Sequence, residues 1–310
     1  MCSPQAFLVF FRQRLRQANI RFAITSGQAC VYYGIQQTTK DSDWIIEPAD
    51  LKKLVALLGE LDLSPGMSVS YRAICGAPCS EPYLRNGWTT HVRITDTEGV
   101  EHFLDFFGQA PRVTVVEYDR DDPDYASRTL VAQMKKTDRE KDWPFVATLG
   151  RQAIAQGDAR GILHGQDADW LIQTWNAIEP SRRTELTADR PLLHLIDAQP
   201  TKLRRAVMIE KFIWQAVNRS RYRVYQQAWK EFFRQWRREP GFQWPVEASF
   251  EVQSNLLTDA AIRYKLPESP LDLATKESAL RDARQEAADV FAATMEELEQ
   301  IAPPLRILLP

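Results

Sequence analysis

Apolar and polar residues alternate in short blocks over the first 150 residues of the chain. An amphipathic stretch predicts a helix over residues 51–61, and a second helix is predicted over residues 129–143, where Pro144 ends it. Because the middle strands are joined by hairpin-length turns, one of them over residues 97–99, the sheet is expected to be mixed. Runs rich in β-branched and aromatic residues predict the strands, which are 21–25, 43–47, 91–95, 101–107 and 113–118.

The pattern changes after residue 150. From about residue 167 to residue 302 the apolar residues follow helical spacing, with proline-containing breaks and little β signal. The predicted fold class is therefore α/β (α+β), with a mixed-sheet domain over residues 1–155 followed by an all-α domain over residues 156–310. A chain of 310 residues is long enough for two domains that each bury a core.

Composition narrows the class of protein. Hydrophobic residues make up 44% of the chain and charged residues 26%, as in soluble globular proteins. No apolar run approaches the roughly 20 residues that a membrane span needs. Residues 1–16 interleave Phe and Leu with Arg and Gln, which predicts an amphipathic helix rather than a signal peptide. A cytoplasmic protein with no membrane partner is expected.

The net charge of -2 conceals a strong asymmetry. Residues 202–238 hold eleven Lys or Arg against two Glu, with seven Trp, Tyr or Phe side chains among them from Trp214 onward, whereas residues 247–299 hold twelve acids against five bases. One interpretation is a cationic face for tRNA or another RNA acceptor. The other is an amphipathic helix whose aromatic residues are core and whose basic face pairs with the acidic segment. Helical spacing favours the core role for most of the aromatic residues.

Two of the four cysteines, Cys75 and Cys79, share the loop CGAPC. With His91 or His102 they could form a zinc site, although the spacing matches no familiar zinc pattern. The favoured interpretation is reduced thiols in a loop.

The stretch ITSGQ, residues 24–28, and the later DSDWII, residues 41–46, carry candidate chemistry. Ser26-Gly27 follows a predicted strand, and a glycine there permits close backbone approach to an anion such as a phosphate. Asp41 and Asp43 stand two residues apart, so in a strand they share one face, and two carboxylates so aligned suit a divalent cation such as Mg²⁺. The alternative is a polar turn before the strand, since Asp and Ser favour turns.

A third carboxylate, Asp105, stands within the apolar run HFLDFF. Asp is disfavoured in strands and costly to bury unpaired, which indicates a functional role; the alternative is an ion pair with Arg93 on the neighbouring strand. Three carboxylates beside a phosphate-binding turn are typical of two-metal nucleotidyl transfer.

These residues resemble the polymerase-β-type nucleotidyltransferase superfamily. The helix predicted over residues 130–143 is similar to the Lys-x3-Arg-x-Lys-Asp helix of bacterial minimal nucleotidyltransferases and AbiEii-like toxins of abortive-infection systems. Two features depart from the pattern. Gln37 stands where related sequences often carry an arginine, and the turn reads Ser-Gly-Gln where Gly-Gly or Gly-Ser is common. The residues that carry the resemblance are Ser26-Gly27, Gly34, Thr39, Asp41, Asp43, Asp105, Lys135, Arg139 and Asp142.

The resemblance implies a nucleotidyltransferase fold and a set of roles. Asp41, Asp43 and Asp105 would bind two Mg²⁺ ions, with Asp105 also acting on the acceptor hydroxyl. Ser26-Gly27 and Lys135 would contact the triphosphate of the NTP substrate. Thr39, Arg139 and Asp142 would complete the nucleotide-binding site. On a helix Lys135, Arg139 and Asp142 would share one face, which leaves Lys136, Asp138 and Lys141 solvated.

The implied activity is transfer of an NMP from an NTP to an acceptor hydroxyl. The basic segment favours a tRNA 3′ end as the acceptor, with a protein side chain or a small molecule as alternatives. The implied setting is a toxin or phage-defence protein with an antitoxin partner. The competing hypothesis is a catalytically inactive protein of the same fold that binds a nucleotide or a partner.

Overall fold

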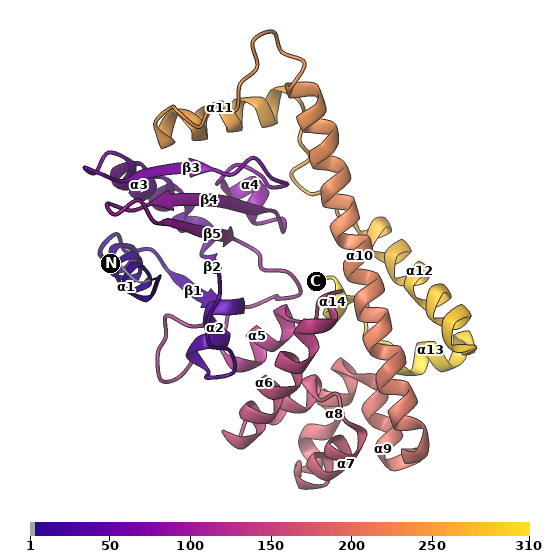
Figure 1. Cartoon of the computed structure of the whole chain (residues 1–310). Coiled ribbons are helices and arrows are strands. Elements are labelled where there is room, and N and C mark those ends of the chain that lie inside the picture. Colours follow the sequence, from indigo (N-terminus) through magenta and orange to yellow (C-terminus); the bar gives the residue numbers. More distant parts are fainter. Residues whose placement is uncertain (1–3) are drawn as a thin grey trace. The chain divides into compact units, whose positions relative to one another are not determined.

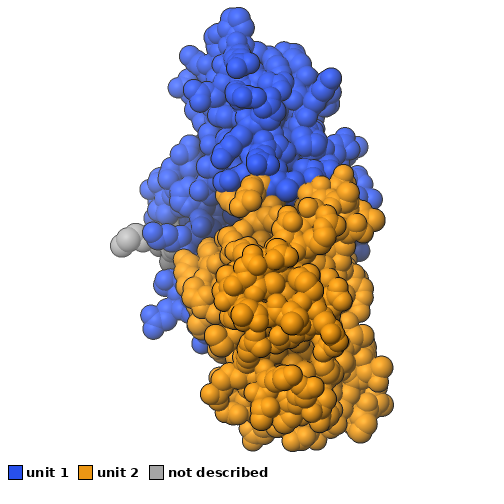
Figure 2. Space-filling model, turned by 90° about the vertical axis from the view of Figure 1, so that its right-hand side faces the viewer, with its two compact units in different colours: residues 1–110, 118–126, 224–270 blue, residues 111–117, 127–223, 271–310 orange. Residues whose placement is uncertain are grey.

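The computed structural model describes residues 4–310, and the chain forms two compact units (Figure 2). Of the described residues, the first unit contains 4–110, 118–126 and 224–270, and the second contains 111–117, 127–223 and 271–310. Both units are therefore discontinuous in the sequence. They differ from the predicted division at residue 155, because residues 127–155 belong to the second unit and residues 224–270 belong to the first.

The first unit contains a five-stranded mixed sheet with the strand order β1-β2-β5-β4-β3 (Figure 1). Strands β2 and β5 are parallel, and the other neighbouring strands are antiparallel, which confirms the predicted mixed sheet. The strands are β1 (Phe22–Thr25), β2 (Asp41–Ile46), β3 (Ser68–Tyr71), β4 (Thr89–Thr95) and β5 (Glu101–Phe107).

The predicted and observed strands differ at two places. Residues 113–117 form bends and irregular backbone, and Tyr118 makes an isolated bridge to Ala126. In contrast, β3 was not predicted, although it pairs with β4 along its whole length. Strand formation depends on a partner strand as much as on β propensity, so short segments are the hardest to assign from sequence.

Alternation along the strands separates the two faces of the sheet. One face carries Trp44, Leu104 and Phe106, and helix α1 (Pro4–Gln17) packs on it. The Phe11 ring lies 5.1 Å from Trp44 and 6.3 Å from Phe106. Helix α3 (Leu51–Asp62) contacts α1 and β3 through a buried leucine face. Odd-numbered residues of β2 and β5 therefore point to the opposite face.

Later parts of the chain complete the first unit. Helix α11 (Phe250–Arg263) covers the edge strand β3, where the Gln253 amide bonds to the Tyr71 N–H and the Val69 carbonyl at 3.0 and 3.2 Å. This pairing satisfies backbone groups that an edge strand leaves open. The remaining helices of the first unit, apart from its share of the long helix α10, are α2 (Ser26–Tyr32) and α4 (Glu81–Leu84).

The second unit is helical, as the periodicity predicts for most of it. Helix α10 is 34 residues long; its residues 203–223 belong to the second unit and its residues 224–236 to the first. Among residues 4–310, no helix is long and apolar enough to cross a membrane. The helices are α5 (Arg128–Met134), α6 (Trp143–Ala155), α7 (Ala168–Ala177), α8 (Pro180–Asp189), α9 (Leu195–Ala198), α10 (Leu203–Trp236), α12 (Leu273–Phe291), α13 (Met295–Ile301) and α14 (Leu305–Leu308), with short 3-10 helices between several of them.

The predicted helix over residues 129–143 is confirmed as far as Met134, and the remainder of the prediction is wrong. Helix α5 ends at Met134, a 3-10 turn follows over Glu140–Asp142, and α6 begins at Trp143 with Pro144 in its first turn. Proline lacks the N–H that an interior helical position requires, whereas the first turn does not use that N–H. Pro144 therefore begins a helix instead of ending one.

Candidate active site

Three carboxylates share one face of the sheet in the first unit. In the parallel pairing of β2 and β5, Asp43 lies directly opposite Asp105, and Asp41 lies opposite Phe103. Residues opposite each other on neighbouring strands, about 4.8 Å apart, point to the same face. Asp41 is exposed and the other two carboxylates are partly exposed, on the face away from α1.

The turn after β1 lies beside these carboxylates. Thr25 pairs with Asp43 in the antiparallel register, so Ser26 and Gly27 begin α2 next to the start of β2. Ser26 has a φ of 53°, in the left-handed region that few L-residues adopt. A strained residue at this point is a feature of turns that position a functional group.

Gly27 fixes the approach of Thr39 to this turn. A Cβ atom at residue 27 would lie 3.0 Å from the Thr39 Cβ and still closer to its Oγ1. The Thr39 hydroxyl in turn donates to the Asp41 carbonyl at 3.1 Å. The turn residues, Thr39 and the first aspartate are thus linked by direct contacts. Helix α2 has only seven residues, so its dipole adds little to this site.

The Asp105 carboxylate is engaged by two side chains. His91, its cross-strand neighbour on β4, places Nδ1 2.6 Å from Oδ1, and an Arg72 nitrogen lies 3.8 Å from the same oxygen. The His91 Nε2 faces the Cys75 carbonyl at 3.1 Å, so each ring nitrogen of His91 lies next to an oxygen atom. The alternative pairing with Arg93 is wrong, because Arg93 bonds to Glu101 at 3.0 Å.

The contacts of His91 and Arg72 with Asp105 were not predicted from the sequence, in which His91 is a candidate zinc ligand only. The signal for His91 is its position in the hairpin, since residues directly opposite on antiparallel strands have neighbouring side chains. Arg72 follows β3, which the sequence pattern did not predict. Its guanidinium also lies over the Phe103 ring, 4.7 Å from the centroid.

The three carboxylates suit a divalent cation in donor type and in placement on the sheet. Hard cations such as Mg²⁺ take carboxylate oxygens together with phosphate oxygens. Within residues 4–310, no three His, Cys, Asp or Glu side chains already surround one point. The Asp105 carboxylate, which His91 and Arg72 engage, is therefore not arranged with Asp41 and Asp43 around one point in this structure.

Lys135, Arg139 and Asp142 meet in the second unit, although not on a helix. The Asp142 carboxylate accepts from the Thr137 hydroxyl at 2.6 Å and from Arg139 at 2.7 Å, and Lys135 lies 3.5 Å away. Burial alone would raise the pKa of Asp142, but the Thr137 hydrogen bond and the two cations hold that pKa below its usual value. A loop, with Lys135 ending α5, brings together residues that a helix was expected to align.

The prediction that Lys136 is solvated is wrong. Lys136 is buried, with 4% of its surface exposed. Its ammonium donates to the Leu163 carbonyl at 2.9 Å and lies over the Trp214 ring. Burial lowers the pKa of Lys136 to about 7. Asp138 and Lys141 are exposed, as expected.

The basic, aromatic segment divides between the two interpretations. Trp214, Tyr225, Phe232 and Trp236 are buried, as the core interpretation predicts. In the second unit, basic residues of α10 pair with acidic helices, as in Arg205–Glu297 at 2.9 Å and Arg219–Glu286 at 2.8 Å.

The C-terminal end of α10, in the first unit, is different. Trp229 and Phe233 are partly exposed and stacked, with ring centroids 4.7 Å apart and planes at 15°. They line a surface groove together with four cationic side chains, which are Lys230, Arg234, Arg237 and Arg238. Stacked aromatic rings among cations are typical of surfaces that bind single-stranded nucleic acid.

Cys75 and Cys79 are free thiols, as the favoured interpretation predicts. Burial raises the pKa of Cys75 to about 11 and that of Cys79 to about 12, so both retain their protons. His102 bonds to Asp96 at 3.0 Å and stacks on Phe7, and His91 bonds to Asp105.

Comparison with protein-family models, with curated proteins and with solved structures finds no match to this chain. Any assignment of function therefore rests on the geometry of the two units and on the sequence resemblance.

Proposed function

We propose that the protein is a Mg²⁺-dependent nucleotidyltransferase with a nucleotidyltransferase fold, which moves an NMP from an NTP to an acceptor hydroxyl and releases pyrophosphate. The observation that carries the proposal is the register of the parallel strands, in which Asp43 lies opposite Asp105 on the face that also carries Asp41. The contact of Gly27 with Thr39 adds the turn at Ser26 to the same region of the first unit.

The carboxylates have distinct roles in this proposal. Asp41 and Asp43 hold the cations, and Asp105 completes the site and accepts the proton of the acceptor hydroxyl. When bound, Mg²⁺ supplies the positive charge that offsets the charge of the transferring phosphoryl group. Ser26 and Gly27 orient the triphosphate, since the glycine lets the backbone approach closely. The expected contact of Lys135 with the triphosphate stays a prediction.

The favoured acceptor is the 3′ end of an RNA such as tRNA. The groove at the end of α10 supports this choice, because its stacked rings and four cations match the requirements of an unpaired nucleotide chain. A protein side chain and a small molecule are the other acceptors of this class. A toxin or phage-defence role with an antitoxin partner follows only from the sequence resemblance.

The second candidate is a catalytically inactive protein of the same fold that binds a nucleotide or a partner. The observation in its favour is that the Asp105 carboxylate is engaged by His91 and Arg72. In that case Asp105 has a structural role, and its loss reduces stability without affecting any transfer.

The decisive experiment incubates the full chain with each α-labelled NTP, Mg²⁺ and total tRNA. Wild type is compared with Asp41→Asn, Asp43→Asn and Asp105→Asn, and with Glu60→Gln, an exposed acid on α3, as the charge-matched control. We expect label on the RNA with wild type and with the control, and a loss of at least about a hundredfold with each Asn variant, the range typical for removing an electrostatic contact to the transition state.

Two outcomes contradict the assignment. Transfer that survives in Asp41→Asn and Asp43→Asn would place the activity elsewhere in the chain. Absence of transfer to RNA, to protein and to small hydroxyl acceptors, with nucleotide binding retained, would establish the inactive binding protein.

A further inference from the structure

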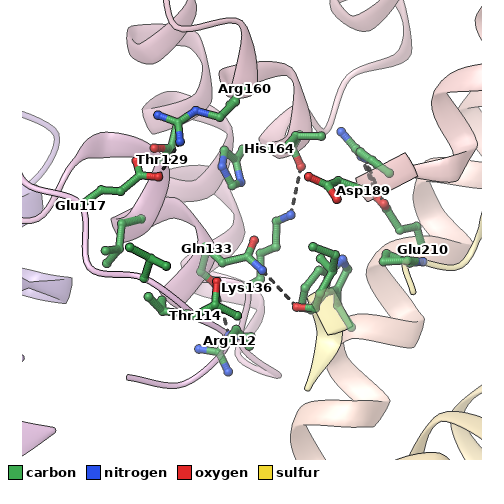
Figure 3. A pocket seen from close by; sticks show the side chains of 18 residues that line it. Arg112, Thr114, Glu117, Thr129, Gln133, Lys136, Arg160, His164, Asp189 and Glu210 are labelled. Atoms are coloured by element: carbon green, nitrogen blue, oxygen red, sulfur yellow. Dashed lines mark hydrogen bonds and ion pairs between the residues drawn. The ribbon is translucent and has the colours of Figure 1, made fainter. Parts of the chain in front are cut away.

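The second unit contains a cavity of about 160 Å³ (Figure 3). The residues that line it include none of those assigned to nucleotide transfer. A cavity of this size accommodates a benzene ring. Its apolar wall includes Val113, Leu130, Trp214 and Ile307, and Lys136 and His164 lie among its polar lining. These residues come from segments that are distant in the sequence, so the cavity exists only in the folded unit.

Buried polar groups in this lining lack partners. Trp214 is 1% exposed, and its indole N–H has no acceptor. His164 is 3% exposed, and its Nδ1 has no partner. Lys136 uses one of its three N–H groups, toward the Leu163 carbonyl. Unsatisfied buried polar groups are costly, so a lining with spare donors favours a ligand that brings acceptors.

The charges of the lining favour a negative charge on that ligand. Each carboxylate is already paired with an arginine, as in Glu117–Arg160 at 2.5 Å, Asp189–Arg306 at 2.7 Å and Glu210–Arg190 at 2.6 Å. Arg112 is committed to the carbonyls of Gln133 and Met134 and to the Asn218 amide. Arg112 and Lys136 both lack a carboxylate partner, but all three nitrogens of Arg112 already donate to protein oxygens, which leaves Lys136 as the cation with unused N–H groups.

The charged and titratable groups that act on Lys136 are Glu210 on α10 and Arg190, Arg112 and His164 on the surrounding segments. Only Glu210 favours the ammonium form, and burial opposes it more strongly. A bound anion would reverse this balance, because an opposite charge within about 4–6 Å favours the charged form of a lysine.

We propose that this cavity binds a small monocarboxylate with a short apolar tail. Its oxygens accept from the Lys136 ammonium and the Trp214 indole N–H, and its tail lies against Val113, Leu130 and Ile307. A phosphate dianion fits less well, because it has no apolar part to lie against these side chains and would bury two charges where Lys136 is the cation with unused N–H groups.

The test measures binding of pentanoate to the full chain by calorimetry at pH 7. Pentanamide, which has nearly the same shape without the charge, and inorganic phosphate are the comparison ligands. We expect pentanoate to bind at least tenfold more tightly than either. Its affinity should fall about tenfold for each pH unit above pH 7, with proton uptake, since binding requires the ammonium form.

Variants localise the site. Lys136→Met should abolish the preference for pentanoate over pentanamide, and Lys141→Met, an exposed lysine of the same segment, should leave it unchanged. Trp214→Phe keeps an aromatic ring without the N–H and should weaken pentanoate binding about fivefold to tenfold, the value of one hydrogen bond. The proposal would be overturned by equal affinities for pentanoate and pentanamide, by tighter binding of phosphate, or by wild-type affinity in Lys136→Met. It would also be overturned by no binding at 10 mM ligand, which corresponds to a binding free energy of roughly −3 kcal/mol.

Discussion

Gly27 packs directly against Thr39, so the turn after β1 is held to the residue that precedes β2 by a contact with no room for a methyl group. The same turn contains Ser26 in the left-handed region. Because this turn is closely packed, the addition of one methyl group at residue 27 should displace its backbone.

Gly27→Ala is expected to destabilise the protein by about 1–3 kcal/mol, the usual cost of overpacking a tight site. The free energy of unfolding in urea measures the effect, and the labelled-NTP assay should show a parallel loss of transfer. Gly59→Ala is the matched control, because a Cβ atom at that position of α3 meets nothing within 4 Å. That control should gain up to about 1 kcal/mol from improved helix propensity. A Gly27→Ala variant as stable as wild type would show that the Thr39 contact is loose.

Arg190 and Glu210 form an ion pair in which each side chain is 2% exposed. Removal of one partner leaves a buried charge without its counterion. Glu210→Leu should therefore cost about 3–5 kcal/mol of unfolding free energy, whereas Arg190→Met combined with Glu210→Leu should recover most of that loss. Urea unfolding of the two single variants and the double variant gives the coupling, and additive losses would contradict a direct interaction.

Lys136 and His164 make stability depend on pH. Burial lowers the pKa of Lys136 to about 7 and holds the pKa of His164 well below its ordinary value of 6.5. The folded state is therefore neutral at Lys136 above about pH 7, while the unfolded chain still binds that proton up to about pH 10. Stability consequently rises with pH over that window, and it falls as the pH drops through 6.5 because the unfolded chain protonates His164.

Lys136→Met removes the lysine contribution. The variant should be more stable than wild type at pH 6, and the difference should shrink steadily between pH 7 and pH 9. Urea unfolding at a series of pH values measures the difference, with Lys141→Met as the control that shows no trend. A difference that is constant with pH would mean that Lys136 keeps its proton in the folded state.

The loop between α5 and α6 is organised around one buried acid, Asp142. Thr137, Arg139 and Lys135 all converge on Asp142, so the loop has an internal anchor in place of helical hydrogen bonds. These residues have helical spacing in the sequence, but they do not form a helix. A new helix, α6, begins beside Pro144, and the residues before it bond through their side chains.

Asp142→Asn should destabilise the second unit by about 1.5–3 kcal/mol, since hydrogen bonds to a charged group are lost. Because the pKa of Asp142 is held below its usual value, wild type should lose this contribution as the pH falls through that lowered pKa, and the variant should lack that part of the acid sensitivity. Thermal unfolding between pH 3 and pH 7 measures both effects. Asp138→Asn, an exposed residue of the same loop, should change neither.

Taken as a whole, the molecule places its cationic, aromatic groove in the unit that carries the three carboxylates. Arg234→Gln, Arg237→Gln and Arg238→Gln combined should weaken binding to single-stranded RNA. The slope of log affinity against log salt should become shallower by about 2, since each lost phosphate contact contributes about 0.7. The matched control replaces three exposed arginines of the second unit, Arg182, Arg204 and Arg281, in the same way. Equal slopes for both variants would argue against the groove as the RNA site.

Much of the local structure follows from the order of residues alone. Alternation and helical spacing predict α1, α3 and four of the five strands, because each depends on neighbours within a few positions. The same period of two places Asp41 and Asp43 on one face without reference to the rest of the chain.

Other features depend on residues far apart in the sequence. The register that sets Asp43 opposite Asp105, the pairing of β3 and the contact of His91 with Asp105 each join separate segments of the first unit. The burial of Lys136 likewise requires distant segments of the second unit, which bring Leu163 and Trp214 against it. Local periodicity does not predict these contacts, because their partners are far apart in the sequence. Each contact forms only when folding closes the long loop between its two residues.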